Sequence, residues 1–200
     1  MTSRRTFITA AVFAAALAAA GCDKLLPRPA FKATDVTGAE FGRDFHLTDF
    51  NGKPRSLADY KGKIVVVFFG YTQCPDVCPT TLAALREVRE RMGPDRDKVQ
   101  VLFITLDPER DTPQLLSQYV PAFDPTFMGL YGDPATTAQT AKDFKVFYAK
   151  NEGKTPTSYT LDHTAAVFIY DTQGRLRLFG GGKYSVEDYL HDLPLLLKAS

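Results

Sequence analysis

The feature that most constrains how this chain folds is an uninterrupted apolar run at residues 64–69 (IVVVFF), β-branched and then aromatic. Six residues are too few for a well-formed buried helix, whereas a strand covered on both faces has this composition. Such a strand needs helices packed on either side of its sheet. The run therefore predicts an α/β domain.

Changes in the spacing of apolar residues along the sequence predict the other helices and strands. Leu82, Leu85, Val88 and Met92 recur at helical spacing, and Gly93-Pro94 ends that helix. Further elements are expected as follows: an N-terminal β-hairpin around Asn51-Gly52, a buried strand at 99–107, a helix opened by Asp111 or Thr112 before Pro113, a helix at 135–144, a hairpin around 172–174, and a terminal helix after Ser185.

This order predicts a central mixed β-sheet flanked by α-helices, which matches the thioredoxin-like architecture. In that architecture the reactive cysteines follow the first buried core strand, at the N-terminus of the next helix. Cys74 and Cys78 occupy this place in the stretch GYTQCPDVCPTT. A helix N-terminus presents free N–H groups and partial positive charge, so we expect it to lower the pKa of these thiols.

The first residues have the pattern of an export signal. Arg4 and Arg5 precede a mostly apolar stretch that ends in AAAGC, and SRRTF resembles a twin-arginine signal. AAAGC resembles a bacterial lipobox, with Cys22 as the lipidated residue; ordinary cleavage nearby is the alternative. We expect a signal at 1–21, a membrane-proximal tether at 22–40 and the folded domain at 41–200, lipid-anchored on the periplasmic face of the inner membrane.

The charge is nearly balanced, with 24 basic and 23 acidic residues. A nucleic-acid-binding domain would show a basic excess, so we expect no nucleic-acid partner.

The C-x-x-x-C spacing differs from the C-x-x-C of redox motifs. Two thiolates are soft ligands that select Cu(I) or Zn, and two rarely complete a site. His46 and His191 fall at positions typical of a solvated surface. His163 is expected in the loop before a buried strand, opposite the cysteines, and is the candidate third ligand. Asp162 is expected to orient the imidazole or add negative charge.

Three stretches, FFGYTQCPDVCPTTL, LDPERDTP and LDHTAAVFIYD, resemble the Sco/SenC family of copper-binding proteins that assist cytochrome c oxidase assembly. The resemblance implies that Cys74, Cys78 and His163 bind one copper ion, as Cu(I) or Cu(II). It also implies delivery to the binuclear copper centre of oxidase subunit II, with other periplasmic copper chaperones or thioredoxin-like proteins as further partners. Asp107 and Asp111, in the second stretch, are interpreted as a strand-end and a helix-cap residue.

Alternatives remain open. A periplasmic thiol–disulfide reductase would cycle Cys74 and Cys78 to keep a partner's cysteines reduced, and this enzymatic role is compatible with copper binding. A peroxiredoxin fits less well, because its proline and threonine upstream of the cysteine are misplaced here. A structural disulfide or zinc site would give the two cysteines no activity.

Overall fold

The computed structural model describes residues 30–155 and 158–199. The export signal and Cys22 lie outside the described residues. The compact unit spans Phe31–Ser200. Its strands are β1 (Thr34–Asp35), β2 (Leu47–Asp49), β3 (Pro54–Arg55), β4 (Ile64–Gly70), β5 (Val99–Thr105), β6 (Met128–Tyr131), β7 (Tyr148–Asn151), β8 (Thr160–His163), β9 (Val167–Tyr170) and β10 (Leu176–Gly180). Its helices are α2 (Val77–Arg91), α3 (Pro113–Tyr119), α4 (Pro134–Asp143) and α5 (Val186–Lys198), with 3₁₀ turns at Leu57–Tyr60 and Gly93–Lys98.

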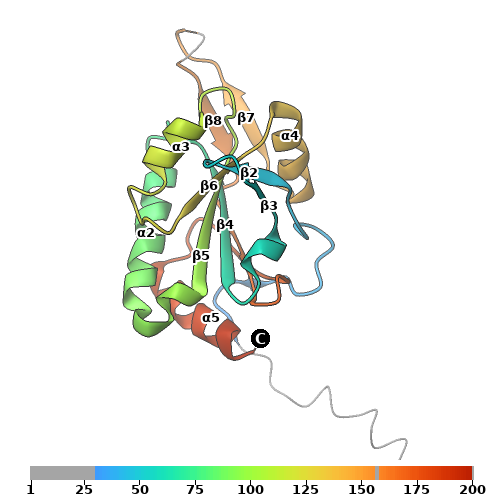
Figure 1. Cartoon of the computed structure of the whole chain (residues 1–200), viewed down its shortest axis with the longest axis vertical. Helices are drawn as coiled ribbons and strands as arrows, with labels where there is room; N and C mark the ends of the chain where they lie inside the picture. Colours follow the sequence, from blue (N-terminus) through green and yellow to red (C-terminus); the bar gives the residue numbers. More distant parts are fainter. Residues whose placement is uncertain (1–29, 156–157, 200) are drawn as a thin grey trace, which may run out of the picture. The chain divides into compact units, whose positions relative to one another are not determined.

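The central sheet is mixed, as predicted. Eight strands follow the order β1-β10-β9-β4-β5-β6-β2-β3, in which β4, β5 and β6 are parallel and the other neighbours are antiparallel. The antiparallel pair β2–β3 is the expected N-terminal hairpin. Every residue of β4 and β5 is buried, because helices cover both faces of the sheet centre. Figure 1 shows α2 and α5 on one side of the sheet and α4 on the other.

Aromatic side chains fill the core on both faces of β4. Phe68 packs against Phe103 of β5, with ring centroids 6.0 Å apart. The next residue, Phe69, points to the opposite face and packs against Phe144 and Phe168 at 5.0 and 5.8 Å. This alternation is the period-two geometry of a strand buried on both sides.

The folded unit begins earlier in the chain than the sequence patterns suggest. Residues 34–35, inside the segment expected to be a tether, form β1 and pair with Leu178 and Phe179 of β10. The backbone N–H groups of Lys32 and Ala33 donate to the buried Asp192 carboxylate of α5 at 2.9–3.0 Å. These long-range contacts leave no periodic pattern in so short a segment.

The strands β7 and β8 form a separate two-stranded ribbon, paired from Tyr148↔His163 to Asn151↔Thr160. Figure 1 shows this ribbon above the upper end of the central sheet, near the loops that follow β4 and β5. Sequence patterns do not reveal it, and they place His163 in a loop. That placement is wrong: His163 is the last residue of β8.

Candidate metal centre

The cysteines lie where the central sheet meets its first long helix. β4 ends at Gly70, the Cys74 N–H donates to the Tyr71 carbonyl at 3.3 Å in the connecting turn, and α2 begins at Val77. Cys78 is therefore in the first turn of α2 and is completely buried, whereas Cys74 is half-buried. Both thiols are free.

The donor atoms of Cys74, Cys78 and His163 lie within 4.8 Å of one another, although the two segments are 85 residues apart at their nearest. The Cys78 Sγ is 3.7 Å from the His163 Nε2. Three ligands placed trigonally at ~2.0–2.3 Å from one ion are ~3.5–4 Å apart, so this separation fits a shared metal. The structure thus brings together the three residues that the sequence nominated and forms a possible metal site.

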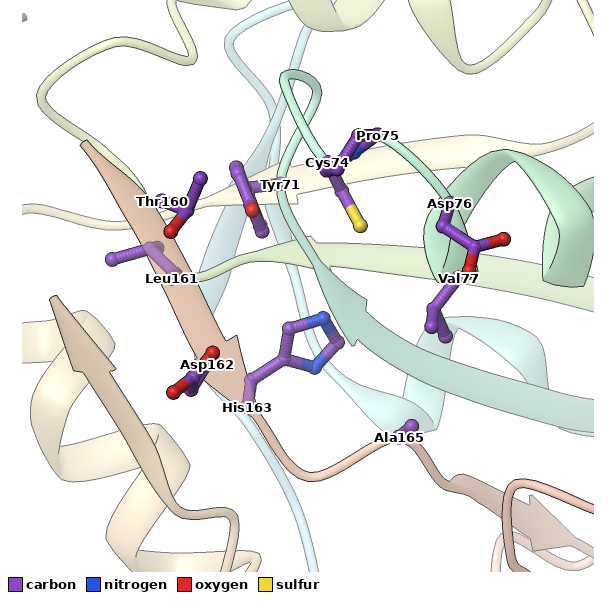
Figure 2. A pocket seen from close by; sticks show the side chains of 10 residues that line it. All are labelled: Tyr71, Cys74, Pro75, Asp76, Val77, Thr160, Leu161, Asp162, His163 and Ala165. Atoms are coloured by element: carbon purple, nitrogen blue, oxygen red, sulfur yellow. The ribbon is translucent and has the colours of Figure 1, made fainter. Parts of the chain in front are cut away.

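A pocket of about 410 Å³ opens over this cluster. Cys74 and His163 both line it, and Figure 2 shows the Cys74 sulfur and the imidazole facing one another across it. Cys78 is fully buried and is not among the residues that line the pocket. The site therefore has two donors that a visiting molecule can reach and one that it cannot.

The imidazole is held by main-chain and aromatic contacts. Its Nδ1 lies 3.2 Å from the Thr164 carbonyl oxygen, so we assign the proton to Nδ1, which leaves the Nε2 lone pair directed at the cysteines. The ring meets Tyr71 edge-on at 6.1 Å and Phe68 at 6.2 Å. Burial lowers the pKa of His163, which favours the neutral ring that binds metals.

Asp162 does not orient the imidazole; the Thr164 carbonyl does. Asp162 is exposed and adjacent on the strand, and in Figure 2 its side chain points away from the imidazole. Successive strand residues face opposite sides, which explains this arrangement. Its remaining effect is electrostatic: its negative charge acts to raise the pKa of His163, against the larger effect of burial.

The expected lowering of the thiol pKa at the helix N-terminus is wrong for Cys78. Burial raises the pKa of this thiol well above its usual range, and the neighbouring Cys74 adds to the rise. Desolvation of a fully buried sulfur outweighs the partial charge of the helix end. A metal that binds here must therefore displace the Cys78 proton.

In the stretch LDPERDTP, the interpretation of Asp111 as a helix cap is wrong. Thr112, not Asp111, caps α3, its hydroxyl accepting from the Leu115 N–H at 3.2 Å. Asp111 is buried and accepts hydrogen bonds from the backbone N–H and the hydroxyl of Thr72 at 3.0 and 2.6 Å. Neither aspartate belongs to the group of donors around His163.

The donor set suits a soft cation. Two sulfurs and one imidazole match Cu(I), whereas structural zinc sites are usually closed by four ligands. In the part of the chain that the structure describes, the cluster has three donors and one side open to the pocket.

Comparisons with known proteins agree with this geometry. The SCO1/SenC family model matches residues 33–198. The mouse mitochondrial protein SCO2 homolog is 34% identical over 152 residues, which cover 75% of this chain and 60% of that protein's length. A copper-bound structure of Bradyrhizobium japonicum ScoI superposes with a TM-score of 0.71 at 44% identity, covering 80% of this chain and all of that one. A SCO1/SenC family lipoprotein from Bacillus anthracis superposes with a TM-score of 0.65 at 25% identity, covering 76% of this chain and 92% of that one.

The family model spans nearly all of the described domain, the matching structures share its thioredoxin-like fold, and one of them holds copper. This chain belongs to the SCO1/SenC family.

Proposed function

We propose that this protein is a copper metallochaperone that holds one copper ion with Cys74, Cys78 and His163 and passes it to a recipient. The observation that carries the proposal is the convergence of three donor atoms within 4.8 Å, with two of the three residues, Cys74 and His163, lining an open pocket. Cu(I) binds as cargo and displaces the thiol protons.

Unequal burial gives ligand exchange a direction. An incoming thiolate, thioether or imidazole reaches the ion from the pocket side, where Cys74 and His163 are replaceable. Cys78, shielded from solvent, is the last protein ligand to leave. A site open on one side lets the ion pass from protein to protein without being released to water.

The recipient we propose is the binuclear copper domain of cytochrome c oxidase subunit II. The Sco family is linked to assembly of this oxidase in general, and this supports the choice. The surroundings of the site support contact with a protein. Among the described residues, the large apolar side chains that are exposed are Val77, which lines the pocket, and Phe147, whose N–H and carbonyl hydrogen-bond Thr164 beside the histidine.

We also propose that the protein works on the periplasmic face of the inner membrane, tethered by lipid at Cys22. The lipobox-like AAAGC and the lipoprotein relative support this. None of the helices within the described residues is long and apolar enough to cross a bilayer. Metabolic labelling with a palmitate analogue, compared with Cys22→Ala, tests the anchor; equal labelling of both proteins would remove it.

The test of the metal site is a competitive Cu(I) titration of the reduced protein without oxygen. Wild type is expected to bind one ion. Losing an outer-shell partner of a metal ligand typically weakens binding by roughly 10- to 100-fold, and His163→Ala, which removes a ligand itself, is expected to weaken Cu(I) binding by more than that. His191→Ala is the matched control, because its ring lies on the exposed face of α5. Equal affinity of wild type and His163→Ala would exclude the histidine from the site.

A second candidate function, thiol–disulfide exchange, has its own support: the two free sulfurs are neighbours and Cys74 is accessible. The Cys74 thiolate would attack a partner disulfide, and Cys78 would then resolve the mixed disulfide. This yields a reduced partner and a Cys74–Cys78 disulfide, which a thioredoxin-like donor would reduce. Copper-loaded protein mixed with the apo oxidase domain separates the two roles, because only the chaperone moves metal.

A further inference from the structure

The turn at residues 107–111, between β5 and α3, contacts both segments that carry the metal donors. Its first contact is with the cysteine segment. The Asp111 carboxylate accepts from the Thr72 N–H at 3.0 Å and the Thr72 hydroxyl at 2.6 Å, two residues before Cys74. The Thr105 hydroxyl at the end of β5 also donates to Asp111 at 2.6 Å. The cysteine segment is thereby fixed to the sheet.

Its second contact is with the histidine strand. The Arg110 Nη1 donates to the Tyr159 carbonyl at 2.8 Å, and the guanidinium lies over the Tyr159 ring, 3.5 Å from its centroid. Tyr159 immediately precedes β8, which ends at His163. The Tyr159 hydroxyl donates to Asp107 at 2.6 Å, so both ends of the tyrosine are held by this turn.

Arg110 also contacts both the cysteine segment and the histidine strand directly. Its Nη1 lies 3.2 Å from the Gln73 side-chain oxygen, next to Cys74, while its Nε donates to Asp107 at 2.5 Å. The Arg110 side chain is only 10% exposed and that of Asp107 only 3%, so the bond between them forms away from bulk water, whereas the contact with Gln73 lies at the surface. A planar guanidinium can stack on a ring and donate in several fixed directions, which an ammonium cannot do.

Resting on the copper site proposed above, we propose that the 107–111 turn is a brace that sets the separation between the two sulfurs and the imidazole. Arg110 is its positioning residue: it binds no copper and acts through His163. Without the Arg110 contacts, the start of β8 is held to this turn mainly by the Tyr159 hydroxyl bond to Asp107, so its position relative to the cysteine segment is less fixed. Loss of such a supporting contact is expected to weaken metal binding by about 10- to 100-fold.

The test is a double-mutant cycle on Cu(I) affinity with Arg110→Lys and His163→Ala. Lysine keeps a positive charge near Asp107, so we expect the metal-free protein to stay folded, but the lysine cannot bridge Tyr159 and Gln73. Arg110→Lys alone is expected to lose about 10- to 100-fold in affinity. In the His163→Ala background the same change is expected to cost nothing further, because the ligand that it positions is gone.

Three further measures keep the result interpretable. Arg96→Lys is the matched control, since the Arg96 side chain is 61% exposed and distant in sequence from both donor segments. Should Arg110→Lys unfold, the cycle is repeated with Tyr159→Phe, which keeps the ring and the carbonyl but removes the hydroxyl bond to Asp107. Thermal unfolding of the metal-free proteins reports purely structural damage.

Each outcome of the cycle either supports or overturns the proposed brace. A loss confined to the background that retains the histidine supports the brace. Unchanged affinity in Arg110→Lys, or an equal loss in both backgrounds, overturns it while leaving the copper site intact. If His163→Ala binds Cu(I) as tightly as wild type, the ligand set itself fails, and the brace fails with it.

Discussion

Replacing Gly70 with alanine tests how tightly the buried cysteine is packed. A Cβ built at Gly70 would lie 2.7 Å from the Cys78 Sγ, 2.9 Å from the Phe103 ring and 3.2 Å from the Phe68 ring. Real Cβ atoms essentially never come within 3.0 Å of such neighbours. Cys78 and Phe103 are fully buried, so neither can turn out into solvent.

The magnitude follows from overpacking. Forcing one extra carbon into a dense core costs about 1–3 kcal/mol. For a domain of this size each kcal/mol lowers the melting temperature by about 2–4 °C, so Gly70→Ala is expected to melt about 2–12 °C below wild type. If the metal-free protein instead relieves the clash by moving the Cys78 sulfur, the cost falls on copper binding, where the same free energy corresponds to about 5- to 150-fold weaker Cu(I) binding.

Thermal unfolding of the metal-free protein and Cu(I) competition measure the two effects. Gly181→Ala is the matched control, since nothing lies within 4 Å of its added Cβ and its backbone needs no positive φ. In a Cys78→Ala background the new methyl enters the space left by the sulfur, so Gly70→Ala is expected to destabilise less there. Unchanged melting temperature and unchanged affinity in Gly70→Ala would refute this account of the packing.

Three other outcomes are expected. Phe147→Ser should slow copper transfer to an apo acceptor domain, measured by stopped-flow absorbance, without changing Cu(I) affinity, because this side chain is 67% exposed beside the site; unchanged transfer would contradict contact there. Asp171→Asn should lower the free energy of unfolding at pH 7 by about 1.5–3 kcal/mol. Burial acts to raise the pKa of Asp171, but hydrogen bonds, those from Arg175 foremost, bring it below its usual value. Its stabilisation is thus complete above the unfolded pKa of about 3.9 and is lost as pH falls through the lower folded pKa, so urea unfolding should show the two proteins converging in acid. Ser185→Ala should cost about 0.5–2 kcal/mol in the same assay by removing the capping box with Asp188 at the start of α5, and no loss would argue against that cap.

Local patterns predicted the central strands and the long helices of the domain. The run now seen as β4, the helical spacing of α2 and the Ser185 cap of α5 are each contained in a few neighbouring residues. The short strand β6, with a glycine among four residues, has no such signal. It forms because β5 and β2 pair with it on either side, which is a property of the assembled sheet.

The three donor residues of the site could be predicted from the sequence, but the distances between their donor atoms could not. Residue types and motif spacing nominate the two cysteines and His163, yet the bonds that hold them join distant parts of the chain. Thr72 and Asp111 are 39 residues apart, and Asp107 and Tyr159 are 52 apart. Apolar periodicity reports which face of an element is buried, whereas a polar contact between two loops repeats nowhere along the sequence. Periodic sequence patterns therefore predict the sheet, whereas single long-range pairs of residues determine the separation of the donors. Substituting the residues of those pairs is for this reason the informative way to probe the site.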